Sequence, residues 1–499
     1  MVPRLIQGGM GAGVSGWALA QSVAREGQLG VVSGTALDTI MVRRLATGDP
    51  GGHIRRALAA FPIPELVERV LHRFLPGGVP GANAAASDPA GQRFKALPLL
   101  RAKQAPEREW LLVLANFVEV YLAREGHEGV VGINYLHKIQ FPVLPSLYGA
   151  ILAGVNVVLI GAGIPGEIPA IMDRLSRHEC VTAALEVLDA GDRRFELSFD
   201  PASMWREHGR EVPPPVARPD FLAIVSSATL ARALLKKAPG GIQGFVVELP
   251  IAGGHNAPPR GVQQLSCRGE PIYGERDMVD FAGMAALGVP FWLGGGYATR
   301  EKFNEAIALG AHGIQVGTVF AFCDESGLDP SLRRRFLAGV LRGEGEVFTD
   351  PSASPTRFPF KVAGLTETLS EESVYHRRPR MCDMGYLRRA YLKSDGTLDY
   401  RCPAEPIGDY ARKGGRAEDA VGRKCLCNGL VANLGLSQRR ADGYEEPPLL
   451  TAGDDLECLK PFISPDRLSY HAKDVVRALV PMEWSAISPP CASTPHATV

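Results

Sequence analysis

Residues 290–320, PFWLGGGYATREKFNEAIALGAHGIQVGTVF, contain the repeating unit of the fold. The apolar run at 290–293 predicts a buried strand, and the run at 313–316 predicts a second one. Between them, residues 300–310 have the composition and length of a helix. Alternation of strand, helix and strand indicates an α/β protein with a parallel sheet.

The same alternation extends back to the N-terminus. The predicted strands are apolar throughout, as expected where both faces of a sheet are covered. They are Arg4–Gln7, Leu29–Ser33, Val130–Leu136, Val155–Ile160, Phe221–Ser226, Gly244–Glu248, Pro290–Leu293 and Gly313–Val316. Eight strand–helix units predict a closed (β/α)₈ TIM barrel.

Two stretches interrupt this rhythm, and a third follows it. Residues 36–128 include the amphipathic segment EREWLLVLANFVEVYLAREG and predict a helical insertion after the second strand. RRFELSFDPASMW (193–205) predicts a strand–turn excursion. We therefore expect a barrel at 1–327, with the helical insertion at 36–128 inside it, and a separate α-rich or irregular C-terminal region at 328–499.

Composition restricts the partners. Lys+Arg and Asp+Glu are both 54 in 499 residues, so the net charge is zero and neither nucleic acid nor an anionic membrane is expected as the main partner. The nine cysteines are too few and too scattered for a disulfide framework. We expect a small-molecule substrate and allow for a homo-oligomer.

The N-terminal residues MVPRLIQGGMG lack the pattern of a signal peptide. The uncharged stretch 147–165 contains several glycines and a β-branched run, so it predicts a helix that leads into a buried strand rather than a membrane span. The expected location is the cytoplasm.

Glycine clusters follow several of the predicted strands. In a barrel the residues after the strands meet on one face, where active sites lie. The clusters at 294–296 and 317–318 follow the last two strands, a common place for a phosphate group. Tight turns alone would also explain single clusters of this kind.

Residues 11–16, GAGVSG, match the dinucleotide-binding pattern G-x-G-x-x-G. The preceding strand is short, and the acidic residue expected after the second strand is missing. Residues 161–166 match the same pattern with Pro165 inside it. In a chain with 56 glycines such matches arise by chance, so a Rossmann domain is disfavoured.

Four motifs together resemble the nitronate monooxygenase family, also called the 2-nitropropane dioxygenase-like proteins. They are IQGGMG (6–11), GAGIP (161–165), AGGH (252–255) and the stretch 294–320. The resemblance spans roughly residues 1–325 and implies an FMN-dependent TIM barrel. The same motifs are similar to those of the enoyl reductases of polyunsaturated fatty acid and polyketide synthases.

The resemblance implies that His255 is the catalytic base. It also departs from the family pattern after His255, where this chain reads Asn-Ala-Pro-Pro-Arg260 and the substrate pocket is expected to differ. The residues expected to hold FMN are Gly8, Gly9, Met10, Asn134, Gly161, Gly253, Gly254, Gly295, Gly296, Gln315, Gly317 and Thr318.

Two reactions fit these residues. The favoured one is oxidation of a nitronate or a related activated carbanion by FMN and O₂, with His255 removing or holding a proton. The alternative is reduction of an enoyl thioester by NAD(P)H, with His255 donating the proton instead. A third hypothesis is that the barrel serves only as a non-enzymatic scaffold. His255 beside the glycine pair argues against this hypothesis.

Some features of the C-terminal region stay open. Cys382, Cys402, Cys425 and Cys427 follow the spacing C-x₁₉-C-x₂₂-C-x-C, which lacks the paired knuckles of common zinc sites. We favour separate reduced cysteines and no metal, with a structural zinc site as the alternative. The candidates to bind an anionic substrate are Arg260 and the run 376–378.

Overall fold

The computed structural model describes residues 3–76, 92–238 and 240–481. Its centre is a closed, fully parallel barrel with the strand order β1-β11-β10-β9-β8-β4-β3-β2. The barrel strands are β1 (Leu5–Gln7), β2 (Leu29–Ser33), β3 (Val131–Leu136), β4 (Val157–Gly161), β8 (Asp220–Val225), β9 (Gly244–Glu248), β10 (Phe291–Gly294) and β11 (Gly313–Val316). Each strand expected from the sequence is present, so the TIM-barrel prediction is confirmed.

Apolar side chains from most of the strands fill the barrel. Ile6, Leu29, Leu159, Val246 and Trp292 belong to a separate, fully buried cluster inside it. Trp292 closes one end, where its indole N–H donates to the carbonyl of Pro3 at 2.9 Å. The interior is therefore a packed core, and any ligand must bind at the strand ends.

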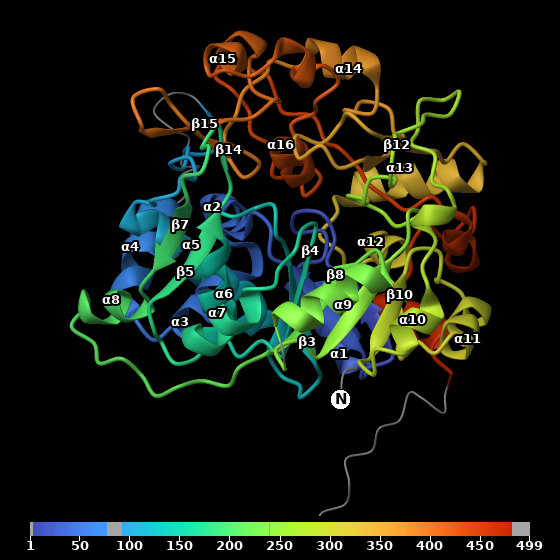
Figure 1. Cartoon of the computed structure of the whole chain (residues 1–499), viewed down its shortest axis with the longest axis horizontal. Helices are drawn as coiled ribbons and strands as arrows, with labels where there is room; N and C mark the ends of the chain where they lie inside the picture. The colour runs from blue at the N-terminus through green and yellow to red at the C-terminus, as the bar shows by residue number, and fades with distance from the viewer. Residues whose placement is uncertain (1–2, 77–91, 239, 482–499) are drawn as a thin grey trace, which may run out of the picture.

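The outer helices surround the barrel (Figure 1). They are α1 (Trp17–Arg25), α6 (Val143–Leu152), α7 (Ile168–Leu175), α9 (Ala228–Lys237), α10 (Phe281–Ala285) and α11 (Arg300–Ala308), with the short α12 (Thr318–Ala321) after the last strand. Gly11–Gly16 lead into α1 as part of this barrel, so the Rossmann alternative is excluded. Residues 147–165 form the end of α6 and β4, as predicted, and no helix among the described residues is long and apolar enough to cross a membrane.

The predicted insertion after β2 is helical. It contains α2 (Leu37–Ala46), α3 (His53–Ala59), α4 (Pro64–Phe74) and α5 (Pro106–Arg124); its residues 77–91 lie outside the described ranges. The helix α5 packs on α1, α2, α3 and α6, which explains its nearly continuous burial. The predicted strand at 193–205 is β7 (Phe195–Phe199), which is followed by α8 (Pro201–Arg206). It pairs antiparallel with β5 (Val181–Leu185), a strand that was not predicted.

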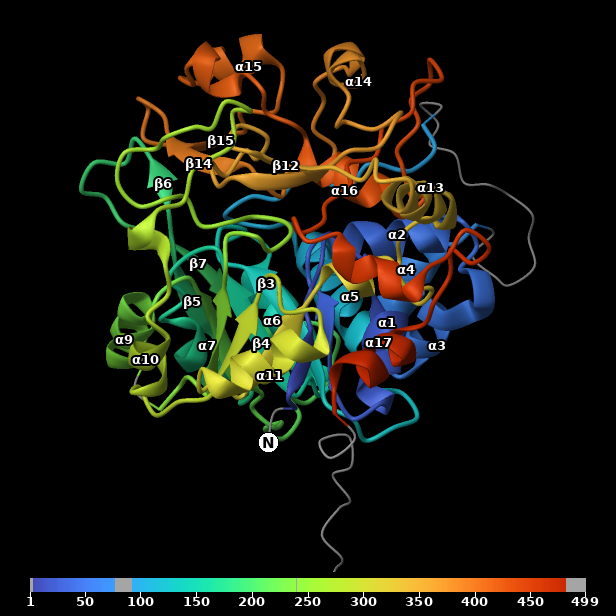
Figure 2. The same ribbon diagram turned by 90° about the vertical axis from the view of Figure 1, so that its right-hand side faces the viewer.

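The C-terminal region lies across one end of the barrel (Figures 1 and 2). Its helices are α13 (Pro330–Leu341), α14 (Glu372–Arg377), α15 (Ile407–Arg412), α16 (Leu426–Ala432) and α17 (Ala472–Leu479). It also contains strands that the sequence did not suggest. In one sheet, β12 (Val347–Asp350) pairs with β13 (Phe360–Ala363). In another, β14 (Arg389–Leu392) pairs with β15 (Leu398–Arg401) and with β6 (Val187–Leu188), which lies between β5 and β7 in the chain. The division at residue 328 remains a prediction.

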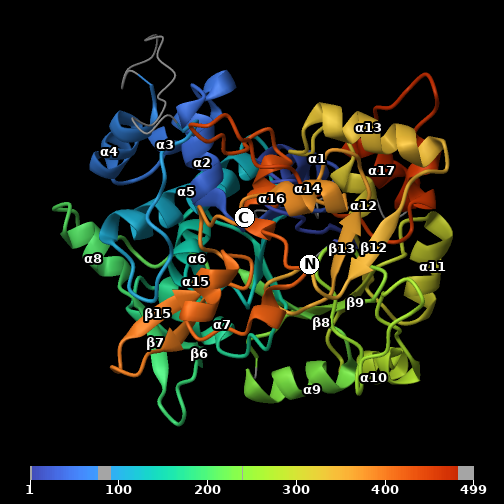
Figure 3. The ribbon, with the colours of Figure 1, turned by 90° about the horizontal axis from the view of Figure 1, so that it is seen from above.

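Buried polar contacts fasten this region to the helical insertion. The Tyr386 hydroxyl donates to Asp38, whose other oxygen lies 2.7 Å from Arg108 Nη2. Arg43 donates to the carbonyl of Leu436 at 2.6 Å. Seen from above, the C-terminal helices and strands cover the centre of the molecule (Figure 3). The C-terminal region thus forms the roof over the strand ends.

Candidate active site

A large cavity of about 460 Å³ lies at the carboxyl ends of the barrel strands, under the C-terminal region. Its size is within the range of small-molecule and cofactor sites. The predicted catalytic residue and all the residues predicted to hold FMN line this cavity: Gly8, Gly9, Met10, Asn134, Gly161, Gly253, Gly254, His255, Gly295, Gly296, Gln315, Gly317 and Thr318. The barrel topology brings them together because parallel strands all end on the same face.

Glycines at the floor of the cavity allow close contacts between strand ends. A Cβ atom on Gly9 would lie 2.4 Å from the Cβ of Asn134, and one on Gly8 would lie 3.3 Å from the side chain of Gln315. Asn134 is held in turn by hydrogen bonds from its Nδ2 to the carbonyls of Tyr135 and Leu159. The side chains of Asn134 and Gln315 therefore occupy the space that a larger residue would need.

The turn after β10 presents two backbone N–H groups. Gly295 and Gly296 have φ values of 94° and 76°, both in the left-handed region that favours glycine. Among the described residues, no hydrogen bond uses the N–H of either glycine. Successive unengaged N–H groups in such a turn form a concave anion-binding site.

The C-terminal region completes the cavity wall. The N–H of Gly453 donates to Thr318 Oγ1 at 2.9 Å, and Thr451 Oγ1 accepts from the N–H of Gly254 at 2.9 Å. The Thr318 hydroxyl keeps its own proton free to donate. Leu426 and Leu430 of α16 add apolar lining. Sequence analysis predicted Gly254 and Thr318 but missed Leu426, Leu430, Thr451 and Gly453, because these four belong to no recognisable motif.

His255 lines the cavity. Its backbone forms an isolated antiparallel β-bridge with Phe360 of β13. Its Nε2 lies 2.6 Å from Ser354 Oγ, and its ring packs edge-on against Phe360 with 4.9 Å between centroids. Burial lowers the pKa of His255 to about 4. The imidazole is therefore neutral at pH 7 and has a lone pair that can accept a proton.

Glu248, at the end of β9, is a candidate that sequence analysis missed. It lines the cavity, and burial raises the pKa of its carboxyl to about 7. A carboxyl with a pKa near working pH can both donate and accept protons. Its place at the end of a barrel strand was the signal that could have identified it.

Asn256 follows His255 and is buried, with 2% of its surface exposed. Its Nδ2 donates to the carbonyl of Ala252 at 2.9 Å, whereas its Oδ1 is buried without a hydrogen-bond partner. A buried oxygen without a partner costs stability unless a ligand supplies a donor. Asn256 also lines the cavity, so its oxygen is placed to accept from a bound group.

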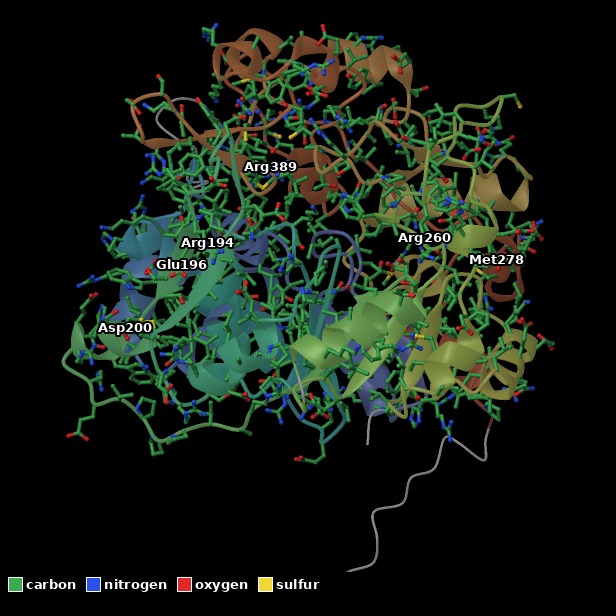
Figure 4. All side chains as sticks on the ribbon, in the orientation of Figure 1. Arg194, Glu196, Asp200, Arg260, Met278 and Arg389 are labelled. Atoms are coloured by element: carbon green, nitrogen blue, oxygen red, sulfur yellow. The ribbon has the colours of Figure 1, made fainter. Side chains whose placement is uncertain are left out.

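The predicted anion-binding residues separate in the structure. Arg260 lies at the cavity rim between the barrel and its roof, where its Nη2 donates to the carbonyl of Ser226 at 3.1 Å (Figure 4). Arg378 is instead buried in an ion pair with Glu446, and His376 contacts Glu372 on the surface. None of residues 376–378 lines the cavity. Only Arg260 is therefore placed to meet a substrate there.

Comparison with known proteins matches residues 217–343 to the nitronate monooxygenase family model. A probable nitronate monooxygenase of Bacillus subtilis is 32% identical over 114 residues, which are 23% of this chain and 31% of that relative. The chain thus matches about a third of the length of that curated relative.

Solved structures of low similarity include FabK from Thermotoga maritima, with 15% identity, a TM-score of 0.44 and coverage of 96% of this chain and 91% of that one. Nitroalkane oxidase from Streptomyces ansochromogenes has 13% identity, a TM-score of 0.42 and coverage of 95% and 94%. The enoyl reductase domain of MlnA from Bacillus amyloliquefaciens has 12% identity, a TM-score of 0.43 and coverage of 95% and 92%.

The matched segment runs from just before β8 to the end of α13. It contains Glu248, His255 and the glycine turns after β10 and β11. The resemblance to the nitronate monooxygenase family that the sequence motifs indicated is confirmed over residues 217–343.

Proposed function

We propose that this protein is an FMN-dependent oxidoreductase that oxidises a nitronate or a related activated carbanion with O₂. The observation that carries the proposal is the convergence of the glycine turns, Asn134, Gln315 and His255 on one cavity. The family match over residues 217–343 supports an oxidoreductase.

The residues present fit a flavin mononucleotide. The unengaged N–H groups of Gly295 and Gly296, with the hydroxyl of Thr318, would hold the phosphate. Gly8, Gly9 and Gln315 would lie against the ring system. The unpartnered Oδ1 of Asn256 matches a ligand with an N–H donor.

A bound flavin would supply the electron acceptor for the substrate and the site that reacts with O₂. The neutral His255 accepts a proton from the carbon next to the nitro group, and by keeping that proton it prevents the nitronate from being protonated again at this carbon. Ser354 fixes the imidazole through the bond to Nε2, which leaves Nδ1 as the basic atom when Nε2 is the donor. The apolar roof, including Leu426 and Leu430, limits the access of water.

Reduction of an enoyl thioester by NAD(P)H is the second candidate function. Glu248 favours it, because a carboxyl with a pKa of about 7 gives the cavity a proton donor at neutral pH. Anaerobic mixing with NADPH separates the two candidates. Rapid bleaching of the flavin without a nitronate present would support the reductase, whereas bleaching only by a nitronate would support the oxidase.

The purified protein is expected to be yellow and to carry noncovalent FMN. The cavity and its unengaged N–H groups supply the space and the anion site that the cofactor requires. An absorbance spectrum, followed by identification of the flavin released on heating, checks this. A colourless protein that stays colourless after reconstitution with FMN would contradict the proposal and favour a scaffold role.

Glu248→Gln is expected to flatten the pH dependence of stability. Burial raises the pKa of Glu248 to about 7, above its unfolded value, so the folded state favours the protonated form. The protonated carboxyl contributes to the free energy of unfolding. This contribution is complete below about pH 4.5, the pKa of the carboxyl in the unfolded chain, and is lost as the pH rises through about 7. The wild type should therefore lose more thermal stability between these pH values than the variant.

Melting temperatures measured across that window check the prediction. Glu305→Gln is the matched control, because Glu305 lies on the exposed face of α11. It should keep the wild-type pH dependence. Equal slopes for wild type and Glu248→Gln would show that the Glu248 carboxyl is ionised in the folded protein at neutral pH.

A further inference from the structure

Four cysteines from distant parts of the C-terminal region surround a second, small cavity. Cys382 lies in the loop before β14, Cys402 directly follows β15, and Cys425 and Cys427 lie at the start of α16. All four line this cavity. Cys402, Cys425 and Cys427 also pack together in an apolar cluster apart from the main core. The fold therefore gathers thiols that the sequence spacing leaves unconnected.

Positive charge also faces this group. Arg388 lines the small cavity, and its Nη1 is buried without a hydrogen-bond partner. A buried cation beside several thiols is favourable only when those thiols become anionic, as they do on binding metal.

The spacing of the ligands argues against one ion. Within residues 3–76, 92–238 and 240–481, no three His, Cys, Asp or Glu side chains are arranged to hold a metal ion. The four thiols thus surround a cavity but do not converge on one point. A tetrahedral zinc site requires each sulfur to approach the same ion to about 2.3 Å. In an iron–sulfur cluster the cysteines bind different irons or opposite sides of the cluster, so they stand farther apart.

We propose that Cys382, Cys402, Cys425 and Cys427 bind an iron–sulfur cluster in the roof of the barrel. The proposal goes beyond the reaction inferred above and does not depend on it.

The cluster site shares a wall with the barrel cavity. Leu387, Leu426 and Cys427 line both cavities, so a single layer of side chains separates them. An iron–sulfur cluster at this place would lie next to the flavin that we propose for the barrel cavity.

Iron and acid-labile sulfide content test the proposal directly. The full chain, purified without oxygen and reconstituted with ferrous iron and sulfide, is expected to retain about two or four of each per chain after gel filtration. Reduction by dithionite should bleach its broad visible absorbance and produce a paramagnetic signal at low temperature. Flavin released by heat is measured on the same sample, so loss of FMN and loss of iron are read separately.

Cys402→Ser should reduce the bound iron by at least about fivefold, because the cluster loses one of its four ligands. Cys323→Ser is the matched control, since Cys323 is equally buried but lines neither cavity. It should retain wild-type iron content. If Cys402→Ser does not fold, the metal content of the wild type alone decides.

Three results would overturn the proposal: reconstituted wild type with no iron, one zinc ion per chain in place of iron, or iron content equal in Cys402→Ser and in Cys323→Ser.

Discussion

His255→Asn is expected to lower kcat/KM for a neutral nitroalkane by about 10²–10⁴-fold, the usual contribution of a positioned acid–base group. The bound flavin should keep its spectrum, because the glycine turns after β10 and β11 lie elsewhere in the cavity. A preformed nitronate has already lost its proton, so its oxidation should fall less. Stopped-flow reduction of the flavin by each substrate measures the difference.

The pH profile provides a second check on His255. Burial lowers the pKa of His255 to about 4, and a base must be deprotonated to act. Activity should therefore hold through the range near 6.5 where an ordinary histidine titrates, and should fall only as pH approaches about 4.

Ser354→Ala serves as the companion to His255→Asn. It removes the partner 2.6 Å from Nε2 but keeps the imidazole, so turnover should fall less than in His255→Asn. Equal and small losses for nitroalkane and nitronate in His255→Asn would mean that His255 only shapes the cavity, and the proposed base would have to be sought elsewhere, first at Glu248.

Gly295→Ala is expected to weaken FMN binding by tenfold or more. Gly295 has φ of 94°, a conformation that costs an alanine about 1–2 kcal/mol. The added Cβ would also lie 3.1 Å from the backbone nitrogen of Ala252 and 3.2 Å from the carbonyl of Leu249, in the turn that leads to His255. In the free variant the β10 turn can relax away from this strain and carry its N–H groups out of place. FMN binding must then restore the strained turn, and each 1.4 kcal/mol of that cost weakens binding tenfold.

Fluorescence titration of apoprotein with FMN measures the affinity. Gly288→Ala is the matched control, since Gly288 has φ of 66° and nothing within 4 Å of an added Cβ. It carries the backbone strain without touching the cavity, so its FMN affinity should match that of the wild type. Unchanged affinity in Gly295→Ala would place the phosphate away from the β10 turn.

Much of the barrel was predictable because its strands are short, buried and separated by helices. Runs such as Leu29–Ser33 and Gly244–Glu248 need burial on both faces, and the structure places them at those bounds. Parallel strands end on one face, so the sequence alone predicts that the glycines after β10 and β11 lie beside His255. Local composition and topology suffice for such residues.

The roof of the site was not predictable in this way. Ser354 and Gly453 lie in loops, and their partners His255 and Thr318 are about 100 or more residues away along the chain. The four cysteines around the second cavity come from separate segments of the C-terminal region. Glu248 looked like the last residue of an ordinary strand until burial in the cavity raised the pKa of its carboxyl. The sequence by itself thus determined the barrel and the floor of its cavity, because those follow from the pattern of neighbouring residues. Only the tertiary structure decided the roof and the pKa values of the site, because they depend on burial and contacts between segments that are distant along the chain.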